Sequence, residues 1–310
     1  MGMDASSDPS AVGLFDARYL AFLETIRHLR RSLHRYCSRM TGSVLDGEDV
    51  VQDALFHAYR KLDTFEDGRP LEPWLFRIAH NHCIDFLRRR RVRRRAEAVA
   101  IEPESVEVFE ATGPGVERAI EHLVLALPPK ERACVLLKDI FDYSLEEIAD
   151  LVDSTVGGVK SALSRGRAKL ATLPRVRATP TPSAESAESA ETRRLLDLYV
   201  ERFNRRDWDG VRELITADAR VRIPDRFAGR LSASPYFGRY DRLTSPWRVA
   251  AGTVDGEPVV LALRKGPDGW IPDAIVRIER SDGHIARIVD YTHCQWVLSS
   301  AASVVMSGAT

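Results

Sequence analysis

Residues 65–95 read FEDGRPLEPWLFRIAHNHCIDFLRRRRVRRR, and this stretch decides how the first part of the chain folds. Seven of its last eight residues are arginine. They continue a pattern of apolar residues at spacings of three and four, which predicts one amphipathic helix with a cationic end. A run of like charge can also be a solvated tail, but a disordered tail would not end an amphipathic helix. Bases stack on aromatic rings while cations follow phosphates, so we expect this helix to contact nucleic acid.

The region before this helix offers a second candidate surface. Residues 15–95 have helical periodicity, and within residues 48–61 the apolar side chains form one stripe. The stripe consists of Val50, Val51, Ala54, Leu55, Ala58 and Tyr59. Asp49, Gln52 and Asp53 lie off the stripe and are expected to face outward. Residues 65–70 break the helix, and Pro73 suits the first turn of the next one.

Residues 116–170 predict a helix-turn-helix. Pro128-Pro129 ends a first helix, and residues 133–141 form a second. Ser144-Leu-Glu-Glu147 is a capping box that opens the next helix. A tight turn follows, in which Asp153 can adopt the left-handed conformation, and it leads into a basic helix over 156–170. The second helix of such a pair enters the major groove of DNA. A plain helical hairpin is the alternative, and the capped first helix with a basic second helix favours DNA binding.

Two segments of biased composition divide the chain. Residues 96–115 are acidic and contain Pro103, Gly113 and Pro114, which is typical of a linker. Residues 173–191 are rich in Pro, Ser, Ala and Glu, a low-complexity linker. The chain is therefore predicted to fold as separate parts joined by these segments.

The last part of the chain has an α+β pattern. Residues 195–204 and 208–215 are predicted helices, the second with Asp207 as its N-cap, and residues 219–223 alternate as a strand. Three Asp-Gly pairs, beginning at Asp255, Asp268 and Asp282, each stand between apolar runs. Such pairs are a strong hairpin signal and predict a four-stranded antiparallel meander that ends near Trp296. Helices before a curved sheet make a cone with an apolar pocket.

Composition excludes several classes of protein. Formal net charge is zero, so basic character is local rather than general. The four cysteines lack metal-ligand spacing, and His80, His82 and Cys83 point in different directions on one helix, so neither a metal nor a cofactor is expected. No apolar run approaches the roughly 20 residues that span a membrane. The N-terminus lacks a signal-peptide pattern, so we expect a cytoplasmic protein with no membrane contact.

The first 170 residues resemble a bacterial extracytoplasmic-function (ECF) sigma factor of RNA polymerase. GEDVVQDALFHAYR, residues 47–60, is similar to the segment by which these factors hold the β′ clamp helices of the core enzyme. The resemblance therefore implies a core-binding role for Asp49, Gln52 and Asp53, with the β subunit as a further partner.

The two DNA-binding segments of the family have counterparts here. PWLFRIAHNHCIDFLRRRR, residues 73–91, resembles the segment that melts the promoter and reads its −10 element, and Asn81 matches a position that contacts that element. The loop 65–72 matches one that pockets a flipped base. The residues implied for −10 recognition and melting are Phe65, Arg69, Trp74, Arg77, Asn81, Arg88, Arg89 and Arg90.

Residues 127–170 resemble the −35-binding domain. The residues implied for the −35 contact are Ser154, Thr155, Lys160, Ser161, Ser164, Arg165 and Arg167. The family commonly has VKSRL where this chain has VKSAL, so Ala162 replaces an arginine. One contact to DNA is therefore expected to be missing.

Residues 192–296 resemble the SnoaL-like branch of the NTF2-like fold, which includes ketosteroid isomerases and polyketide cyclases. Tyr199 falls where the isomerases keep an oxyanion-holding tyrosine, but Ile223 stands where the general-base aspartate belongs. An isoleucine cannot abstract a proton, and Asp225 lies two positions on. The resemblance implies a possible ligand pocket lined by Tyr199, Ile223, Trp247 and Tyr291.

The fold expected is multi-domain: two all-α sigma domains and a cone-shaped α+β NTF2-like domain. The expected boundaries are 15–95 for sigma-2, a helical bundle; 96–115 for a linker; 116–172 for sigma-4, with the helix-turn-helix; 173–191 for a second linker; and 192–298 for the SnoaL-like regulatory domain. The function expected is that of an alternative sigma factor without catalytic activity, acting with core polymerase and the −10 and −35 promoter elements. The alternatives are a helix-turn-helix repressor, which usually needs a dimer, and a DNA-binding module fused to a cyclase or isomerase.

Overall fold

The computed structural model describes residues 9–66, 69–98, 124–172, 187–267 and 269–307. These residues fall into two compact units, a helical unit that ends near Pro174 and a C-terminal α+β domain. Both units match the fold class expected from the sequence. The predicted linkers 96–115 and 173–191 lie mostly outside the described residues, although α3 continues to Ala98 and α8 begins at Ala187.

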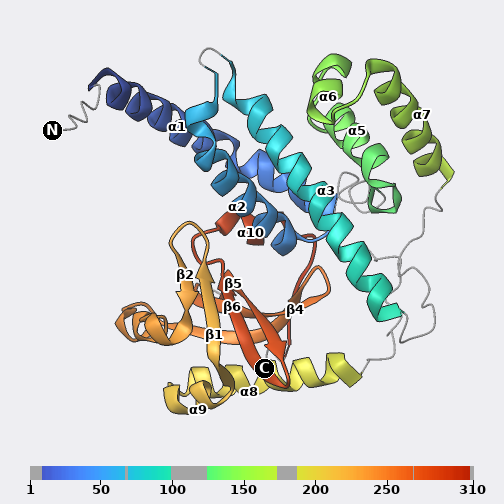
Figure 1. The fold of residues 1–310 in the computed structure, drawn as a ribbon. Helices are drawn as coiled ribbons and strands as arrows, with labels where there is room; N and C mark the ends of the chain where they lie inside the picture. The colour runs from blue at the N-terminus through green and yellow to red at the C-terminus, as the bar shows by residue number, and fades with distance from the viewer. Residues whose placement is uncertain (1–8, 67–68, 99–123, 173–186, 268, 308–310) are drawn as a thin grey trace. The chain divides into compact units, whose positions relative to one another are not determined.

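The helical unit begins with three long helices (Figure 1). They are α1 (Pro9–Thr41), α2 (Val44–Arg60) and α3 (Leu71–Ala98), with a 3₁₀ turn η1 (Leu62–Thr64) after α2. Gly42 ends α1 with φ of 86°, a left-handed conformation that favours glycine. Gly47 lets α2 approach α1 closely, because a Cβ there would lie 2.5 Å from the backbone nitrogen of Ser38. The predicted helical region is thus divided at residues 42–43 as well as after α2.

The same unit contains the helix-turn-helix. Its elements are η2 (Val124–Ala126), α5 (Pro129–Asp139), α6 (Leu145–Leu151) and α7 (Val156–Thr172). The capping box is confirmed: the Ser144 hydroxyl accepts from the Glu147 amide and the Glu147 carboxylate accepts from the Ser144 amide. Asp153 has φ of 50°, as the turn requires. The predicted first helix over 120–127 lies mainly outside the described residues.

One apolar core joins all six helices of this unit that the structure describes. Leu33 and Met40 of α1, Phe76 of α3, Leu136 of α5 and Leu163 of α7 are all at most 5% exposed and belong to the same cluster. Within this unit α5 packs against α1 and α3 and α6 packs against α3, while α7 packs against α5 and α6.

The C-terminal domain places two helices before a seven-stranded sheet. The helices are α8 (Ala187–Asn204) and α9 (Trp208–Glu213), and Asp207 caps α9 as expected. The strands are β1 (Ile215–Ile223), β2 (Phe227–Arg230), β3 (Trp247–Val254), β4 (Glu257–Gly266), β5 (Gly269–Ser281), β6 (His284–Asp290) and β7 (Val304–Met306). Two 3₁₀ turns, η3 (Leu231–Ala233) and η4 (Phe237–Arg242), separate β2 from β3, and α10 (Gln295–Ser300) precedes β7.

The sheet order is β2-β1-β6-β5-β4-β3-β7, with β1 and β6 parallel. Strands β3 to β6 form the predicted antiparallel meander, with turns at Asp255-Gly256 and Asp282-Gly283. Gly269 stands at the third turn, whereas Asp268 lies outside the described residues. One prediction was wrong: Ile215 opens β1 rather than ending α9, because its pairing with Ile285 of β6 outweighs the local helical pattern.

Candidate functional site

Helix α3 separates its polar residues between two faces. His80 is 6% exposed, and its Nδ1 lies 2.8 Å from the Tyr36 hydroxyl in the core. The next residue, Asn81, is exposed, as is Arg77 one turn before it. Arg88 continues this outward side at the following turns, since positions three and four apart share one helix face. We call Arg77, Asn81 and Arg88 the outer face of α3.

The cations on the outer face of α3 are held only weakly by acids. Arg88 lies 3.0 Å from Asp85, and both side chains are more than half exposed. Arg89 donates to the Asp85 carbonyl at 3.4 Å. Exposed ion pairs contribute about 0–1 kcal/mol, so a phosphate can replace Asp85 at little cost.

Arg90 differs from the arginines before it. Its Nη1 donates to the carbonyl of Thr41 at 3.1 Å and lies 3.9 Å from Asp46, where α1 meets α2. Arg90 was grouped with the DNA-contacting arginines from the sequence, and the structure instead gives it a contact inside the helical unit.

Two aromatic rings meet at the start of α3. The rings of Phe65 and Trp74 are 4.7 Å apart at 45°, and both side chains are half-buried. Arg69 beside them pairs with Glu66 at 2.8 Å and is well exposed. The structure therefore brings the loop residue Phe65 against the helix residue Trp74, and Arg69 of the same loop contacts Glu66.

Helix α2 points one carboxylate outward. Asp53 is exposed, whereas Gln52 turns to donate to Glu48 at 2.9 Å and Asp49 is half-buried. Glu48 is fully buried and pairs with Arg30. Asp49 and Gln52 were expected to face outward with Asp53, and only Asp53 does so fully.

Sequence reasoning missed an aromatic beside this carboxylate. Phe56 is 63% exposed one turn after Asp53, and the Arg60 guanidinium lies 6.0 Å from its ring. Tyr59 belongs to the apolar stripe expected from the sequence, yet its ring is 46% exposed and packs edge-on against Tyr19. The spacing of Phe56 from Gln52 and Asp53 was the available signal. We call Asp53, Phe56 and Arg60 the outer face of α2.

Helix α7 carries the polar residues predicted for it, and their partners differ. Thr155 accepts from the Gly158 amide at 3.1 Å and so caps the helix. Arg165 pairs with Glu131 at 3.0 Å, and Arg167 makes two bonds to Asp139. Lys160 is exposed and has no ion pair within the described part of the chain.

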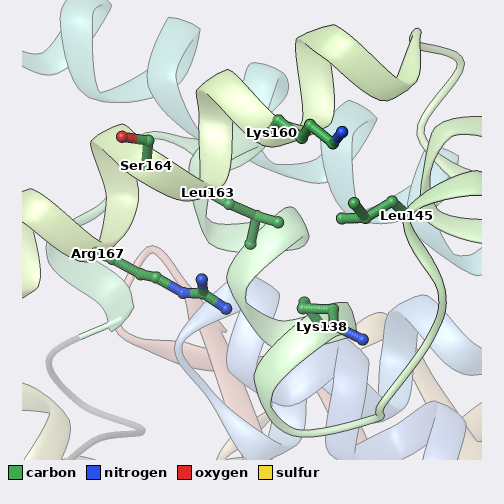
Figure 2. A pocket seen from close by; sticks show the side chains of 6 residues that line it. All are labelled: Lys138, Leu145, Lys160, Leu163, Ser164 and Arg167. Atoms are coloured by element: carbon green, nitrogen blue, oxygen red, sulfur yellow. The ribbon is translucent and has the colours of Figure 1, made fainter.

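A hollow of about 510 Å³ lies beside α7. Figure 2 shows Lys160, Ser164 and Arg167 on α7 around it, with Lys138 of α5 and Leu145 of α6 across from them. Its lining contains three cationic side chains and no acid. Arg167 and Lys138 pair with Asp139 and Asp142 outside the lining, so Lys160 is the cation that this hollow offers to an anion.

Ala162 does not belong to this surface. It is fully buried in the core of the helical unit, between the exposed Ser161 and the buried Leu163. The position that commonly holds arginine in the resembled family therefore faces packed side chains here. The expectation of one missing DNA contact stays a prediction.

The expected pocket of the C-terminal domain is occupied by aromatic rings. Phe203 packs against five rings with centroids 4.9–6.2 Å away; they belong to Tyr199, Trp208, Phe237, Tyr240 and Trp247. Tyr199 and Tyr291 are each 1% exposed, and Ile223 and Trp247 are half-buried. Burial raises the pKa of Tyr199 well above its usual value.

A buried carboxylate that sequence reasoning missed lies beside these rings. Asp290 is fully buried, and its Oδ2 accepts from the hydroxyls of Tyr236 and Tyr240 at 2.8 and 2.9 Å and from Arg239 at 2.5 Å. Its Oδ1 accepts from the amide and the hydroxyl of Thr292. Burial, and then the Asp290 charge, raise the pKa of Tyr236 well above its usual value, so this tyrosine remains a donor.

The geometry of Asp290 argues against a catalytic base. A carboxylate offers about four lone-pair positions, and five donors already occupy them. A general base needs a free position within hydrogen-bond reach of its substrate. Asp290 therefore holds the segment 236–240 to the end of β6.

Among the described residues, no helix is long and apolar enough to cross a membrane. His82 lies 3.4 Å from His57 of α2, whereas His80 and Cys83, three positions apart on α3, are both buried in the core. His82 therefore points away from the other two, and the expectation that all three point in different directions was wrong for His80 and Cys83.

Comparisons with known proteins agree with the helical unit. Residues 25–93 match the family model of sigma-70 region 2, and residues 117–170 match that of sigma-70 region 4. The chain is 31% identical over 237 residues to the ECF RNA polymerase sigma factor SigG of Mycobacterium tuberculosis, a match that covers 68% of this chain and 60% of that relative. It is also 31% identical to ECF sigma factor SigW of Bacillus subtilis, over 48% of this chain and 87% of SigW.

Two solved structures are similar over different lengths. The sigma factor RpoE of Bartonella quintana, in complex with the anti-sigma factor NepR, has 27% identity and a TM-score of 0.41, covering 48% of this chain and 94% of that one. The ECF sigma factor SigJ of Mycobacterium tuberculosis has 17% identity and a TM-score of 0.35, covering 88% and 97%.

Proposed function

Because this chain belongs to the ECF family of RNA polymerase sigma factors, we propose that it binds core polymerase and directs transcription initiation at a specific set of promoters. The observation that carries this proposal is the outer face of α3. It presents Asn81 between exposed cations while its neighbour His80 is locked in the core.

At the −10 element, the outer face of α3 would contact a DNA strand that is already unpaired. Asn81 offers both a donor and an acceptor to one base edge. Arg77, Arg88 and Arg89 would follow the phosphates, and the Phe65–Trp74 pair offers a face on which a base stacks. On this helix the contact to a base, which specifies sequence, and the contacts to phosphates, which do not, would be made by different residues.

At the −35 element, α7 would enter the major groove. Lys160, Ser161 and Ser164 are exposed along it, and the cationic hollow beside them accepts a phosphate. Arg165 and Arg167 would exchange their acidic partners for DNA. Residues 96–115 would link this domain to the −10 domain on the promoter.

Core polymerase would bind the outer face of α2. Asp53 supplies a charge and Phe56 an exposed ring at the centre of that face. Aromatic anchors next to charged rims are typical of protein interfaces, so the β′ clamp helices are the partner we propose there. The β subunit is proposed as a second partner.

The C-terminal domain is proposed to regulate the sigma factor without catalysis. Ile223 supplies no base, Asp290 is saturated, and aromatic rings fill the interior around Phe203. A small-molecule ligand would have to displace those rings, so we assign regulation to the domain's surface. The segment between Thr172, where α7 ends, and Ala187, where α8 begins, would hold the domain at about millimolar effective concentration near the sigma domains.

Run-off transcription with core polymerase tests the proposal. The full chain and a version ending near residue 180 are each added to core enzyme on a target promoter, and co-purification with core is measured in parallel. We expect promoter-dependent transcripts from both, at different levels. DNA binding without core association would indicate a repressor, and equal transcript levels would remove the regulatory role.

A further inference from the structure

Three arginines form a row across adjacent strands of the C-terminal sheet. Arg220 of β1 stands directly opposite Arg230 of β2 on one side and Arg287 of β6 on the other. Residues directly opposite each other in a sheet share a face. The neighbours of Arg220 in β1, Ala219 and Val221, are buried with the aromatic interior, so the row lies on the opposite, outer side of the sheet.

The row is only partly neutralised. Arg287 lies 3.3 Å from Glu279, its own cross-strand partner on β5. Arg220 and Arg230 are exposed, and no carboxylate of the described residues lies within ion-pair distance of either one. Two other exposed arginines of this domain are neutralised, since Arg212 pairs with Asp209 at 2.6 Å and Arg264 with Asp273 at 3.1 Å. Arg226 and Arg242 are exposed and unpaired among the described residues as well, but neither stands opposite another arginine in the sheet.

Such a row does not serve the fold. Like charges directly opposite each other on neighbouring strands destabilise a sheet. An arginine pair that the fold neither buries nor neutralises therefore has another use. Guanidinium groups present paired donors that match phosphate oxygens, and strand spacing of about 4.8 Å extends the row over roughly 10 Å. A polymer of phosphates fits this surface better than one small anion.

We propose that Arg220, Arg230 and Arg287, the arginine row, are a third DNA contact of this chain and bind the backbone phosphates of duplex DNA without sequence preference. The identity of the polyanion rests on the proposed function, since promoter DNA held by the helical unit is the polyanion to which this domain is tethered. The tether after residue 172 keeps the row at high effective concentration near that DNA.

The test uses the full chain and a random-sequence duplex without polymerase. Binding is followed by fluorescence anisotropy over a series of salt concentrations for wild type and for R220Q/R230Q. Each lost phosphate contact reduces the slope of log K against log salt by about 0.9, so the double variant should be shallower by about 1.8 and bind about tenfold more weakly at low salt. R212Q/R264Q, in the same domain and with the same charge change, should keep the wild-type slope.

Equal slopes for R220Q/R230Q and R212Q/R264Q would overturn the proposal. A different result would assign the arginine row to an acidic protein partner instead of DNA: R220Q/R230Q would lose binding to poly-glutamate, R212Q/R264Q would keep it, and the DNA salt slope would not change in either variant. Thermal unfolding should show R220Q/R230Q at least as stable as wild type, which separates a lost contact from a lost fold. If the run-off assay gave no transcript while R220Q/R230Q still reduced the salt slope of DNA binding, the sigma-factor proposal would be contradicted and the DNA contact would be supported.

Discussion

The helical unit and the C-terminal domain use their polar residues in different places. In the helical unit, Asp53 and Asn81 are exposed, while the buried polar group His80 bonds to Tyr36 inside the core. In the C-terminal domain, the largest polar cluster surrounds the fully buried carboxylate of Asp290. A buried group with every position occupied stabilises a fold, and an exposed group with free positions is available to a partner. In both units, therefore, the buried polar groups are assigned to the fold and the exposed ones to binding partners.

Replacing Asp290 with asparagine should have the largest effect on stability. The change leaves Arg239, Tyr236 and Tyr240 without their charged acceptor, and breaking one side of a buried pair costs about 3–5 kcal/mol. Urea unfolding followed by tryptophan fluorescence measures the loss. Asp273→Asn, at an exposed pair, should change stability by less than about 0.5 kcal/mol. An unchanged midpoint for Asp290→Asn would mean that the cluster is not structural.

The stability of the helical unit should fall as pH drops from about 6.5 to 4. Burial lowers the pKa of His80 from 6.5 to about 4, so the unfolded chain takes up a proton in this window while the folded chain does not. One pKa unit corresponds to about 1.4 kcal/mol, so His80 alone accounts for about 3 kcal/mol near pH 4. Unfolding of wild type and His80→Gln is compared at several pH values. Parallel pH profiles would show that His80 is not responsible.

Asp53→Arg should abolish core binding while leaving the fold intact. A reversed charge against an interface complementary to the native one costs several kcal/mol, or at least about a hundredfold in affinity. Binding to core polymerase is measured by anisotropy and folding by circular dichroism. Asp63→Arg, at another exposed acid, is the matched control. Loss of helical signal in Asp53→Arg would make this residue part of the fold rather than of the interface.

Asn81→Ala should reduce discrimination between −10 sequences rather than the affinity for DNA in general. Loss of one base contact costs about 1–3 kcal/mol on the preferred −10 sequence and little on a mismatched one. Replacing Arg88 and Arg89 with glutamine should weaken all sequences alike and flatten the salt dependence by about 1.8 in slope. Both variants are compared on matched and mismatched single-stranded −10 oligonucleotides with the holoenzyme. The same sequence-independent loss in both would remove the specific role of Asn81.

Much of the fold could be predicted from short-range signals. The Ser144–Glu147 capping box, the left-handed Asp153 and the Asp-Gly turns at 255 and 282 depend on atoms only a few residues apart. Their conformations are fixed by backbone sterics and local hydrogen bonds, which depend only on the residue types at neighbouring positions. The cationic end of α3 was visible for the same reason, since charge and periodicity are both local.

The candidate sites needed the tertiary structure wherever partners are distant in sequence. The bond between Tyr236 and Asp290 joins residues 54 apart, and Arg90 reaches Thr41 across 49 residues. The arginine row exists only because β1 pairs with both β2 and β6 in one register. The residue types and local turns were therefore set by the sequence alone, whereas burial, saturation of Asp290 and alignment of Arg220 with Arg230 and Arg287 were decided by long-range packing. Register and burial depend on which surfaces exclude water together, and no local pattern contains that information.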